Sequence, residues 1–445
     1  MSHRSYFGTD GIRGRVGTSL MNAEFMLKLG WAAGKVLSRQ SHSAVLIGKD
    51  TRISGYMLES ALLAGFSAAG VDTYLVGPMP TPAVAYLTRS VRAAAGVVLS
   101  ASHNPYEDNG VKFFDQSGFK LSDQMERDIE KMIDTPMRTV VSKAIGRATR
   151  LNDAPGRYIE FCKQSFPGHL TLKPYKVVID CAHGATYAVA PRIFYELGAQ
   201  VVTVSADPDG FNINENCGAT NTEQLQATVL EAGADLGLAF DGDGDRLIMV
   251  DHYGEVVDGD QVLGILALFC APADRPVGVV GTIMSNLGLE RALTAAQIPF
   301  LRSSVGDRHV LASLKQRGWV LGGESSGHIV DLRQSTTGDG IIAALGVLKI
   351  MQESGKSLAA LKSVVDKVPQ TLTNLPCPFE QQAVVHDPEI SSVIDQMQLK
   401  MGDAGRILVR PSGTEPLIRV MVEGVCADQV DAVSRALTKA IAARI

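Results

Sequence analysis

Apolar and polar positions near the start of the chain follow a regular order. A continuous apolar run over 44–48 is followed by a helical pattern over 58–70 and by two further apolar runs, 72–77 and 95–100. Continuous apolar strands joined by helical connections are typical of parallel sheets, which are covered on both faces. Ser54, just before the helical pattern, is expected to cap that helix. The segment therefore predicts an α/β domain.

The same order of strand, helix, strand and strand returns in two later segments. Such internal repetition of whole elements predicts repeated domains. We therefore expect three similar α/β domains with mixed or parallel sheets. The later strands are predicted over 176–180, 200–205, 235–240, 277–282, 298–304 and 319–323, and the later helices over 190–199 and 289–297.

The pattern changes after about residue 365, where several prolines occur close together. Two strand patterns, 406–409 and 417–424, and an amphipathic helix that runs to the end then predict a fourth domain of the α+β class. A chain of 445 residues is indeed longer than one hydrophobic core usually serves. The predicted domains are 1–152, 153–253, 254–367 and 368–445.

Charge and composition narrow the class of partner. The formal net charge is −5 and no concentrated basic run is present, which argues against nucleic acid or an anionic membrane. The first residues lack the apolar core of a signal peptide, and no apolar run reaches the about 18 residues of a membrane span, so we expect a cytoplasmic protein that binds a small ligand. The scattered cysteines are expected to be reduced packing residues: Cys162, Cys181, Cys217, Cys270, Cys377 and Cys426.

Each α/β unit has a strand that runs directly into a polar, glycine-rich loop. The loops are SASHNP over 100–105, DGDGDR over 241–246 and GESSGH over 323–328. Open α/β sheets bind ligands at the carboxyl ends of their strands. These loops are therefore the first candidates for chemistry.

The DGDGDR loop predicts a metal site. If the segment is extended, Asp241, Asp243 and Asp245 point to the same side, and oxygen ligands select Mg²⁺ before Mn²⁺ or Ca²⁺. An EF-hand would need glycine and glutamate where the chain has Arg246 and His252. A solvated acidic turn remains as the alternative, but it does not explain the glycines between the aspartates.

The SASHNP loop places Ser102 next to His103. A serine hydrolase is disfavoured because no GxSxG elbow is present and adjacent residues of an extended segment point apart. Ser102 can instead carry a phosphoryl group whose oxygens join a magnesium shell. Taken alone, such a serine is more often an ordinary helix cap.

Four segments offer groups that could bind phosphate or sugar. RPSGTEPLIR, over 410–419, combines two arginines, two hydroxyls and a glycine, which suits a phosphate-binding loop. GESSGH offers donors and acceptors for sugar hydroxyls. Arg13 and Lys112 become phosphate-binding or proton-transfer groups if the loops share one site. Tight structural turns and solvated side chains remain the alternative for each segment.

Taken in order, these motifs resemble those of the α-D-phosphohexomutase family over essentially the whole chain, from FGTDGIRG to RPSGTEP. Within that family, LSASHNPYEDNGVKFF, VGDRHV and GESSGH are more similar to the phosphoglucosamine mutases of bacteria than to the mannose or glucose enzymes. The resemblance implies four domains around one deep central cleft. It also implies that Ser102 is the phosphoserine and, through its phosphate, a ligand of the ion held by the DGDGDR aspartates.

The resemblance leaves the proton-transfer group open. Mannose and glucose relatives often have a histidine where this chain has Asp307. The candidates are Lys112, His309 and His328, with Arg13 beside them. The residues implied in binding the sugar and its phosphate are Arg246, Glu324, Ser326, Arg410, Ser412, Gly413, Thr414 and Arg419.

The expected reaction interconverts glucosamine 6-phosphate and glucosamine 1-phosphate through a bound 1,6-bisphosphate, with one Mg²⁺ per subunit. Alternatives are a phosphomannomutase or phosphoglucomutase, a metal-dependent sugar phosphatase, and a sugar-phosphate-binding regulator without turnover. A homodimer is also expected. Priming of Ser102 is expected from a sugar 1,6-bisphosphate, from the enzyme itself or from a kinase.

Overall fold

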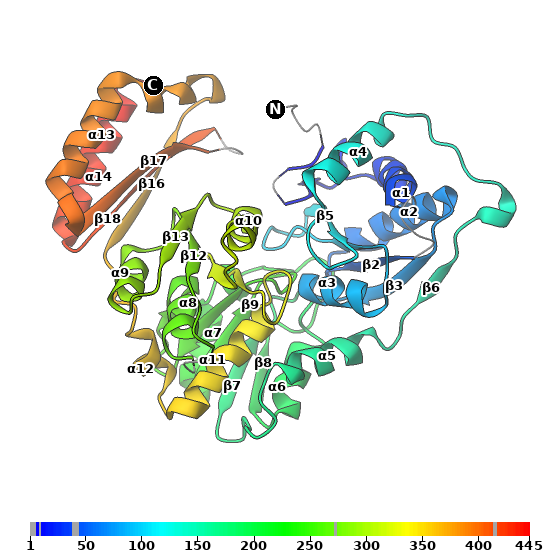
Figure 1. The fold of residues 1–445 in the computed structure, drawn as a ribbon, viewed down its shortest axis with the longest axis horizontal. Helices are drawn as coiled ribbons and strands as arrows, with labels where there is room; N and C mark the ends of the chain where they lie inside the picture. The colour runs from blue at the N-terminus through cyan, green and yellow to red at the C-terminus, as the bar shows by residue number, and fades with distance from the viewer. Residues whose placement is uncertain (1–5, 9, 38–43, 271–273, 413–415) are drawn as a thin grey trace.

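A computed structural model describes residues 6–8, 10–37, 44–270, 274–412 and 416–445. The chain forms four domains that follow one another in an arc, with the first and the last at its two ends (Figure 1). Three domains are α/β and the fourth is α+β, so the predicted fold class is confirmed. Among the described residues, no helix is both long and apolar enough to cross a membrane.

The first domain is built on a six-stranded sheet of order β1-β5-β4-β2-β3-β6. Strands β4, β2, β3 and β6 run parallel, and at one edge β5 pairs antiparallel with both β4 and β1. Helices α1, α2 and α4 pack on one face. The elements are β1 (Ile12–Arg15), α1 (Ala23–Leu37), β2 (Val45–Lys49), α2 (Ser54–Ala69), β3 (Thr73–Pro78), α3 (Thr81–Ser90), β4 (Ala95–Leu99), β5 (Asp108–Asp115), α4 (Asp123–Ile133), η1 (Ser142–Ala144) and β6 (Ala148–Arg150).

The predicted cap of α2 is wrong. The helix starts at Ser54 itself, the cap position is Ile53, and no side chain caps the helix there. The Ser54 hydroxyl instead accepts a hydrogen bond of 2.9 Å from Asn109 Nδ2. The helix ends at Ala69, and the cap residue Gly70 has a φ of 87°, which glycine adopts without strain.

The second domain has a five-stranded sheet of order β11-β10-β9-β7-β8. Its three core strands are parallel, and β10 and β11 add an antiparallel edge, as β5 and β1 do in the first domain. The elements, including the preceding helix, are α5 (Ala154–Gln164), β7 (Lys176–Asp180), α6 (Ala190–Glu196), β8 (Gln200–Val204), η2 (Gly218–Thr220), α7 (Glu223–Ala232), β9 (Leu236–Phe240), β10 (Leu247–Asp251) and β11 (Val256–Val257).

The third domain is a smaller version of the same plan, with a four-stranded sheet of order β13-β12-β14-β15. Only β15 is antiparallel to its neighbour. The elements are α8 (Gly259–Leu268), β12 (Val279–Thr282), α9 (Leu287–Ala295), β13 (Phe300–Ser303), α10 (Asp307–Arg317), β14 (Leu321–Gly323), β15 (Ile329–Asp331), α11 (Gly340–Ser354) and α12 (Leu358–Lys362).

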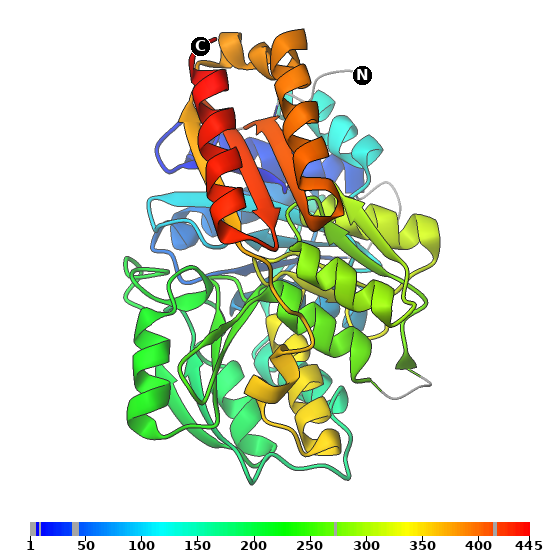
Figure 2. The same ribbon diagram turned by 90° about the vertical axis from the view of Figure 1, so that its left-hand side faces the viewer.

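The fourth domain has an antiparallel sheet of order β16-β18-β17. Helices α13 and α14 lie side by side on one face of this sheet (Figure 2). The elements are β16 (Gln370–Pro376), η4 (Phe379–His386), α13 (Pro388–Met401), η5 (Gly402–Ala404), β17 (Gly405–Pro411), β18 (Leu417–Gly424) and α14 (Ala427–Ala442).

The cores differ in how they join the domains. One large core runs from α3 of the first domain through the second and third domains. The fourth domain has a hydrophobic core of its own. Polar contacts attach it to the third domain: Asn286 Nδ2 donates to Val368 O at 3.1 Å, and Arg406 Nη1 donates to Ile283 O at 2.8 Å. The fourth domain is therefore the most separable of the four.

Candidate active site

The three polar loops follow directly on β4, β9 and β14, at the carboxyl ends of these strands, as the hydrophobic pattern predicted. Domains one and two bring their loops together. Thr81 N, at the start of α3, donates to Asp243 O at 2.8 Å, and Ser102 Oγ reaches the side chain of Asp241. The candidate site therefore lies at the seam between these domains.

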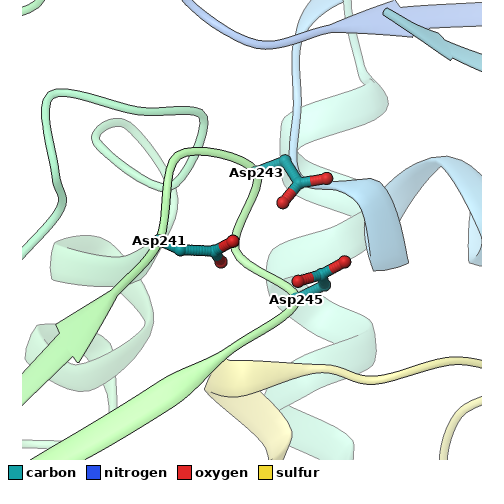
Figure 3. Close-up of side chains that lie close together, drawn as sticks. All are labelled: Asp241, Asp243 and Asp245. Carbon is teal, nitrogen blue, oxygen red and sulfur yellow. The ribbon is translucent and has the colours of Figure 1, made fainter. Parts of the chain in front are cut away.

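Asp241, Asp243 and Asp245 are buried and converge (Figure 3). Each offers one carboxylate oxygen that lies within 4.8 Å of the others. The predicted reason for this convergence was wrong, because the segment is a turn and not an extended strand: Gly244 N donates to Asp241 O at 3.0 Å, and Gly244 has a φ of 72°. The interleaved glycines thus serve the turn, in which a side chain at Gly244 would be strained.

This group of carboxylates fits a divalent cation. Asp243 Oδ1 is buried and has no hydrogen-bond partner among the described residues. Burial, and next the charges of Asp245 and Asp243, raise the pKa of Asp241 well above its usual value. The pKa of Asp245, in contrast, lies well below its usual value: burial opposes its charge, but Lys112 and then His328 favour it. Three converging buried carboxylates, which offer only oxygen ligands, suit Mg²⁺.

Ser102 points into this group. Its Oγ donates to Asp241 Oδ2 at 2.6 Å, and the residue is 1% exposed. Its φ of 56° is left-handed, which is uncommon for a residue with a side chain and implies that its surroundings hold it.

His103 corrects one step of the sequence argument. Because Ser102 is not extended, the two neighbouring side chains do not point apart, and His103 Nδ1 lies 3.3 Å from Ser102 Oγ. Burial, then the charges of Arg246 and Arg13, lower the pKa of His103 to about 4. His103 is therefore neutral at pH 7.

Lys112, on β5, is the principal cation of the site. Its Nζ lies 2.7 Å from Asp243 Oδ2, 3.1 Å from Asp245 Oδ2 and 3.5 Å from Asp10 Oδ2. Burial opposes its charge, but Asp10 first and then the two aspartates raise the pKa of Lys112 well above its usual value. Arg13, on β1, pairs with the same Asp10.

The third domain reaches the site through His328, just before β15. His328 Nδ1 lies 3.6 Å from Asp245 Oδ1, and its Nε2 lies 3.8 Å from Asp307 Oδ2. Burial opposes the charge of this histidine, but Asp245 and Asp307 raise its pKa to about 9. Asp307 in turn contacts Lys120 Nζ at 2.5 Å, and Lys120 pairs with Asp10. Acidic and basic groups therefore alternate from Asp245 back to Lys112.

The other residues proposed for sugar binding and proton transfer are less closely connected. Arg246 N donates to Asp241 Oδ1 at 3.1 Å, so Arg246 adjoins the aspartates. Glu324 Oε1 accepts from Gly306 N at 2.8 Å, ahead of α10. Ser326 and His309 are exposed, and among the described residues no contact joins either of them to the aspartates.

The proposed phosphate-binding loop lies at the turn between β17 and β18. Arg410 and Arg419 occupy directly opposite positions on these strands. Burial, and next the charge of Arg419, lower the pKa of Arg410. Ser412 is buried, and its N donates to Leu417 O at 2.9 Å. Gly413 and Thr414 lie outside the described residues.

Comparison with family models covers all four domains. The three α/β/α domains of the phosphoglucomutase/phosphomannomutase family match residues 4–139, 156–254 and 258–368, and the C-terminal domain of that family matches 372–440. The chain belongs to the phosphoglucomutase/phosphomannomutase family. The expected family is thereby confirmed, and with it the enzyme class, an isomerase that moves a phosphoryl group.

Close relatives within this mutase family share nearly the full length of the chain. A phosphoglucosamine mutase of Coxiella burnetii is 63% identical over 95% of both chains. One from Pasteurella multocida is 57% identical over 98% of this chain and 100% of its own. A solved family protein from Burkholderia thailandensis superposes with a TM-score of 0.81 at 26% identity, covering 99% of this chain and 98% of its own.

The candidate site also contains residues that the sequence motifs did not predict. Asp10 and Lys120 flank Lys112, and Thr81 Oγ1 donates to Asp243 Oδ2 at 2.6 Å. Asp10 lies inside the quoted FGTDGIRG motif and could have been noticed there. Lys120 and Thr81 follow ordinary strands and carry no local signal, because only the meeting of domains makes them neighbours.

Proposed function

We propose that the protein is a phosphoglucosamine mutase, which interconverts glucosamine 6-phosphate and glucosamine 1-phosphate. The observation that carries the proposal is the buried Ser102 hydroxyl, 2.6 Å from Asp241 and beside two further aspartates. The 63% and 57% identical relatives, which are phosphoglucosamine mutases, support the choice of sugar.

In the proposed cycle, phosphorylated Ser102 donates its phosphoryl group to the free hydroxyl of the bound sugar monophosphate. The Ser102 Oγ–P bond breaks and a P–O bond to the sugar forms. A protonated group of the protein gives its proton to Ser102 Oγ, and the proton of the sugar hydroxyl replaces it. The 1,6-bisphosphate then reverses its orientation. Ser102 Oγ takes the phosphoryl group from the other end, so neither phosphate nor enzyme is consumed.

Asp241, Asp243 and Asp245 would hold one Mg²⁺, together with a phosphate oxygen on Ser102. When bound, the ion neutralises charge on the transferring phosphoryl group. The protein supplies position, because Asp241 accepts from Ser102 Oγ and so aims the side chain at the aspartates. Holding reactants in line is worth about 7 to 11 kcal/mol of barrier.

Proton transfer is assigned to the cations around the aspartates. Lys112 and His328 lie against Asp245, and Arg13 reaches Lys112 through Asp10. We favour Lys112 and His328 over His309, which is exposed and makes no described contact with the aspartates.

Sugar and distal phosphate are assigned to the later loops. Arg246, Glu324 and Ser326 would contact the sugar. Such contacts must serve two orientations of the substrate, so the set as a whole has to supply both donors and acceptors of hydrogen bonds. The distal phosphate would be bound by Arg410, Ser412, Gly413, Thr414 and Arg419.

Several wider properties belong to the same proposal. We propose a cytoplasmic homodimer whose domains have the boundaries 1–152, 153–253, 254–367 and 368–445. Priming of Ser102 would come from a sugar 1,6-bisphosphate or from the enzyme itself. A kinase is the weaker alternative, because Ser102 is 1% exposed. The whole loop would have to move out of the protein before Ser102 could enter the active site of a kinase.

Phosphorus-31 NMR tests the function. The enzyme with Mg²⁺ and catalytic glucose 1,6-bisphosphate is given the 6-phosphate of glucosamine, glucose or mannose in separate samples. A 1-phosphate signal that is strongest for glucosamine and absent for Ser102→Ala is expected. Preference for another sugar would keep the mechanism and change the substrate, whereas inorganic phosphate alone would indicate a phosphatase.

A further inference from the structure

Arg52 is a buried arginine whose bonds converge on the loop that carries Ser102. The residue is 0% exposed. Its Nε donates to Asp50 Oδ2 at 2.8 Å, and its two Nη atoms donate to the backbone oxygens of four residues. These acceptors are Ser102 O at 3.1 Å, Asn104 O at 2.7 Å, Asp108 O at 3.0 Å and Pro105 O.

These bonds use all five N–H donors of the guanidinium group. A buried ion pair is weak evidence for stability, because removing two charges from water costs several kcal/mol per ion. The four backbone acceptors, in contrast, all lie within 102–108, between β4 and the start of β5. The N–H groups of Arg52 therefore bind the backbone of a single loop, residues 102–108.

The second domain holds the same part of that loop from the other side. Asn214 Nδ2 donates to Ser102 O and to Asn104 O, both at 3.0 Å. These are two of the oxygens that Arg52 holds. At Gly242 an added Cβ would lie 2.6 Å from Ser102 O and 2.8 Å from Asn214 Nδ2. The backbone of the aspartate loop therefore packs closely against both Ser102 and Asn214.

The backbone conformation of Ser102 is unfavourable for an isolated residue with a side chain. Its φ of 56° lies in the left-handed region, where a residue with a side chain persists only if its surroundings determine it. Asp50 supports the other end of the loop: Ser100 Oγ donates to Asp50 Oδ2 at 2.6 Å, and Ser102 N donates to Ser100 Oγ at 2.8 Å.

We propose that Arg52 is a positioning residue for phosphoryl transfer, which together with Asn214 holds the Ser102 loop so that the hydroxyl points at the aspartates. The inference rests on the proposed role of Ser102. Within the described part of the chain, Arg52 makes no hydrogen bond to the side chains of the three aspartates, so it acts through the loop backbone. Lysine in its place retains a charge but cannot present five donors in one plane.

The test measures the first half-reaction by itself. Unphosphorylated enzyme with Mg²⁺ and saturating glucose 1,6-bisphosphate is sampled by intact-protein mass spectrometry, which gives the rate of Ser102 phosphorylation. Arg52→Lys is expected to slow this rate and kcat by about 100-fold, as a small misplacement of reacting groups does, with little change in KM. Asn214→Ala, which leaves Arg52 in place, is expected to slow both by about 10-fold.

Arg302→Lys is the matched control, since Arg302 also joins a carboxylate, Glu290, to two backbone oxygens, Thr282 O and Ser285 O, in the third domain. It is expected to lower the melting temperature and keep the wild-type rate of phosphorylation. Equal slowing by Arg302→Lys, or wild-type rates in both loop variants, would overturn the inference. If Arg52→Lys does not fold, Asn214→Ala decides. Wild-type enzyme that takes no phosphoryl group on Ser102 would overturn the proposed function itself.

Discussion

The aspartate site and the phosphate-binding loop are opposites in charge. Beside Ser102 three carboxylates converge, and Asp243 Oδ1 has no hydrogen-bond partner among the described residues. In the β17–β18 loop two arginines face each other, and among the described residues no carboxylate lies within ion-pair distance of Arg410. One half-site therefore suits a cation and the other an anion.

The two half-sites also differ in how firmly they are held. Ser102 is buried and fixed by hydrogen bonds from two domains. The arginines belong to a domain with its own core, attached to the third domain mainly by polar contacts. A site that transfers phosphoryl groups needs both properties, because the reacting groups must be rigid while the substrate has to enter and turn.

Removal of the nucleophile has the largest expected effect. Ser102→Ala should abolish mutase activity, on the scale of the about 10⁶-fold loss seen when a nucleophile is removed. Substrate binding by the fourth domain should persist, since Arg410 and Arg419 are untouched. Turnover by phosphorus-31 NMR and binding by calorimetry measure the two parts. Substantial turnover in this variant would show that the phosphoryl group resides elsewhere.

Loss of one carboxylate should separate metal binding from folding. Asp243→Asn removes the negative charge of the carboxylate whose Oδ1 has no hydrogen-bond partner among the described residues. It is expected to lower kcat by about 100- to 1,000-fold and to raise the Mg²⁺ concentration needed for half-maximal activity. Titration of activity with Mg²⁺ after treatment with a chelator measures this. Asp387→Asn, which alters the cap of α13 in the fourth domain, serves as control. An unchanged Mg²⁺ requirement would contradict the assigned ligand.

Charge removal in the fourth domain should weaken substrate binding without impairing the chemistry at Ser102. Arg410→Gln is expected to lower kcat/KM for glucosamine 6-phosphate by about 10- to 100-fold, the worth of a hydrogen bond to a charged group. Phosphorylation of Ser102 should still occur, because the first-domain loop is intact. The substitution also removes the repulsion between the charges of Arg410 and Arg419, which lie directly opposite each other. The free energy of unfolding should therefore rise by about 0.2 to 1 kcal/mol. A fall in stability would show that the arginines do not repel each other in the free protein.

A buried acid near the base of the fourth domain should give the smallest effect. Asp260 Oδ2 accepts a hydrogen bond from Asn286 N at 2.8 Å, and Asn286 Nδ2 donates one to Val368 O. Burial, then Asp258, raise the pKa of Asp260 from 3.8 to about 7. The folded state therefore binds this proton more tightly than the unfolded state, and its stability falls as pH rises from about 4 to about 7.

Asp260→Asn should remove that part of the pH dependence, a difference of about 1 to 3 kcal/mol at pH 8. Denaturant unfolding between pH 5 and pH 8 measures it. An identical pH slope in both proteins would mean that Asp260 does not carry the proton.

Much of this architecture was predictable from the chain alone, because continuous apolar runs end directly at the loops of the site. The SASHNP, DGDGDR and GESSGH loops follow β4, β9 and β14 as expected. Two local conformations were predicted wrongly. The aspartate loop is a turn and not a strand, and Ser102 is left-handed and not extended, so His103 lies beside it. Both errors assumed regular backbone at loops whose shape other domains determine.

The sequence by itself determined the order of domains, the loops that carry chemistry and the acidic character of the site, because these depend on neighbours along the chain. The tertiary structure decided which distant residues meet. Lys120, Thr81 and Asn214 carry no local signal of function, yet they lie beside Asp307, Asp243 and Ser102. The physical reason is that the packing of separate domains buries charged side chains together. Each buried charge then needs an opposite charge, which comes from a neighbouring side chain or from a bound ligand.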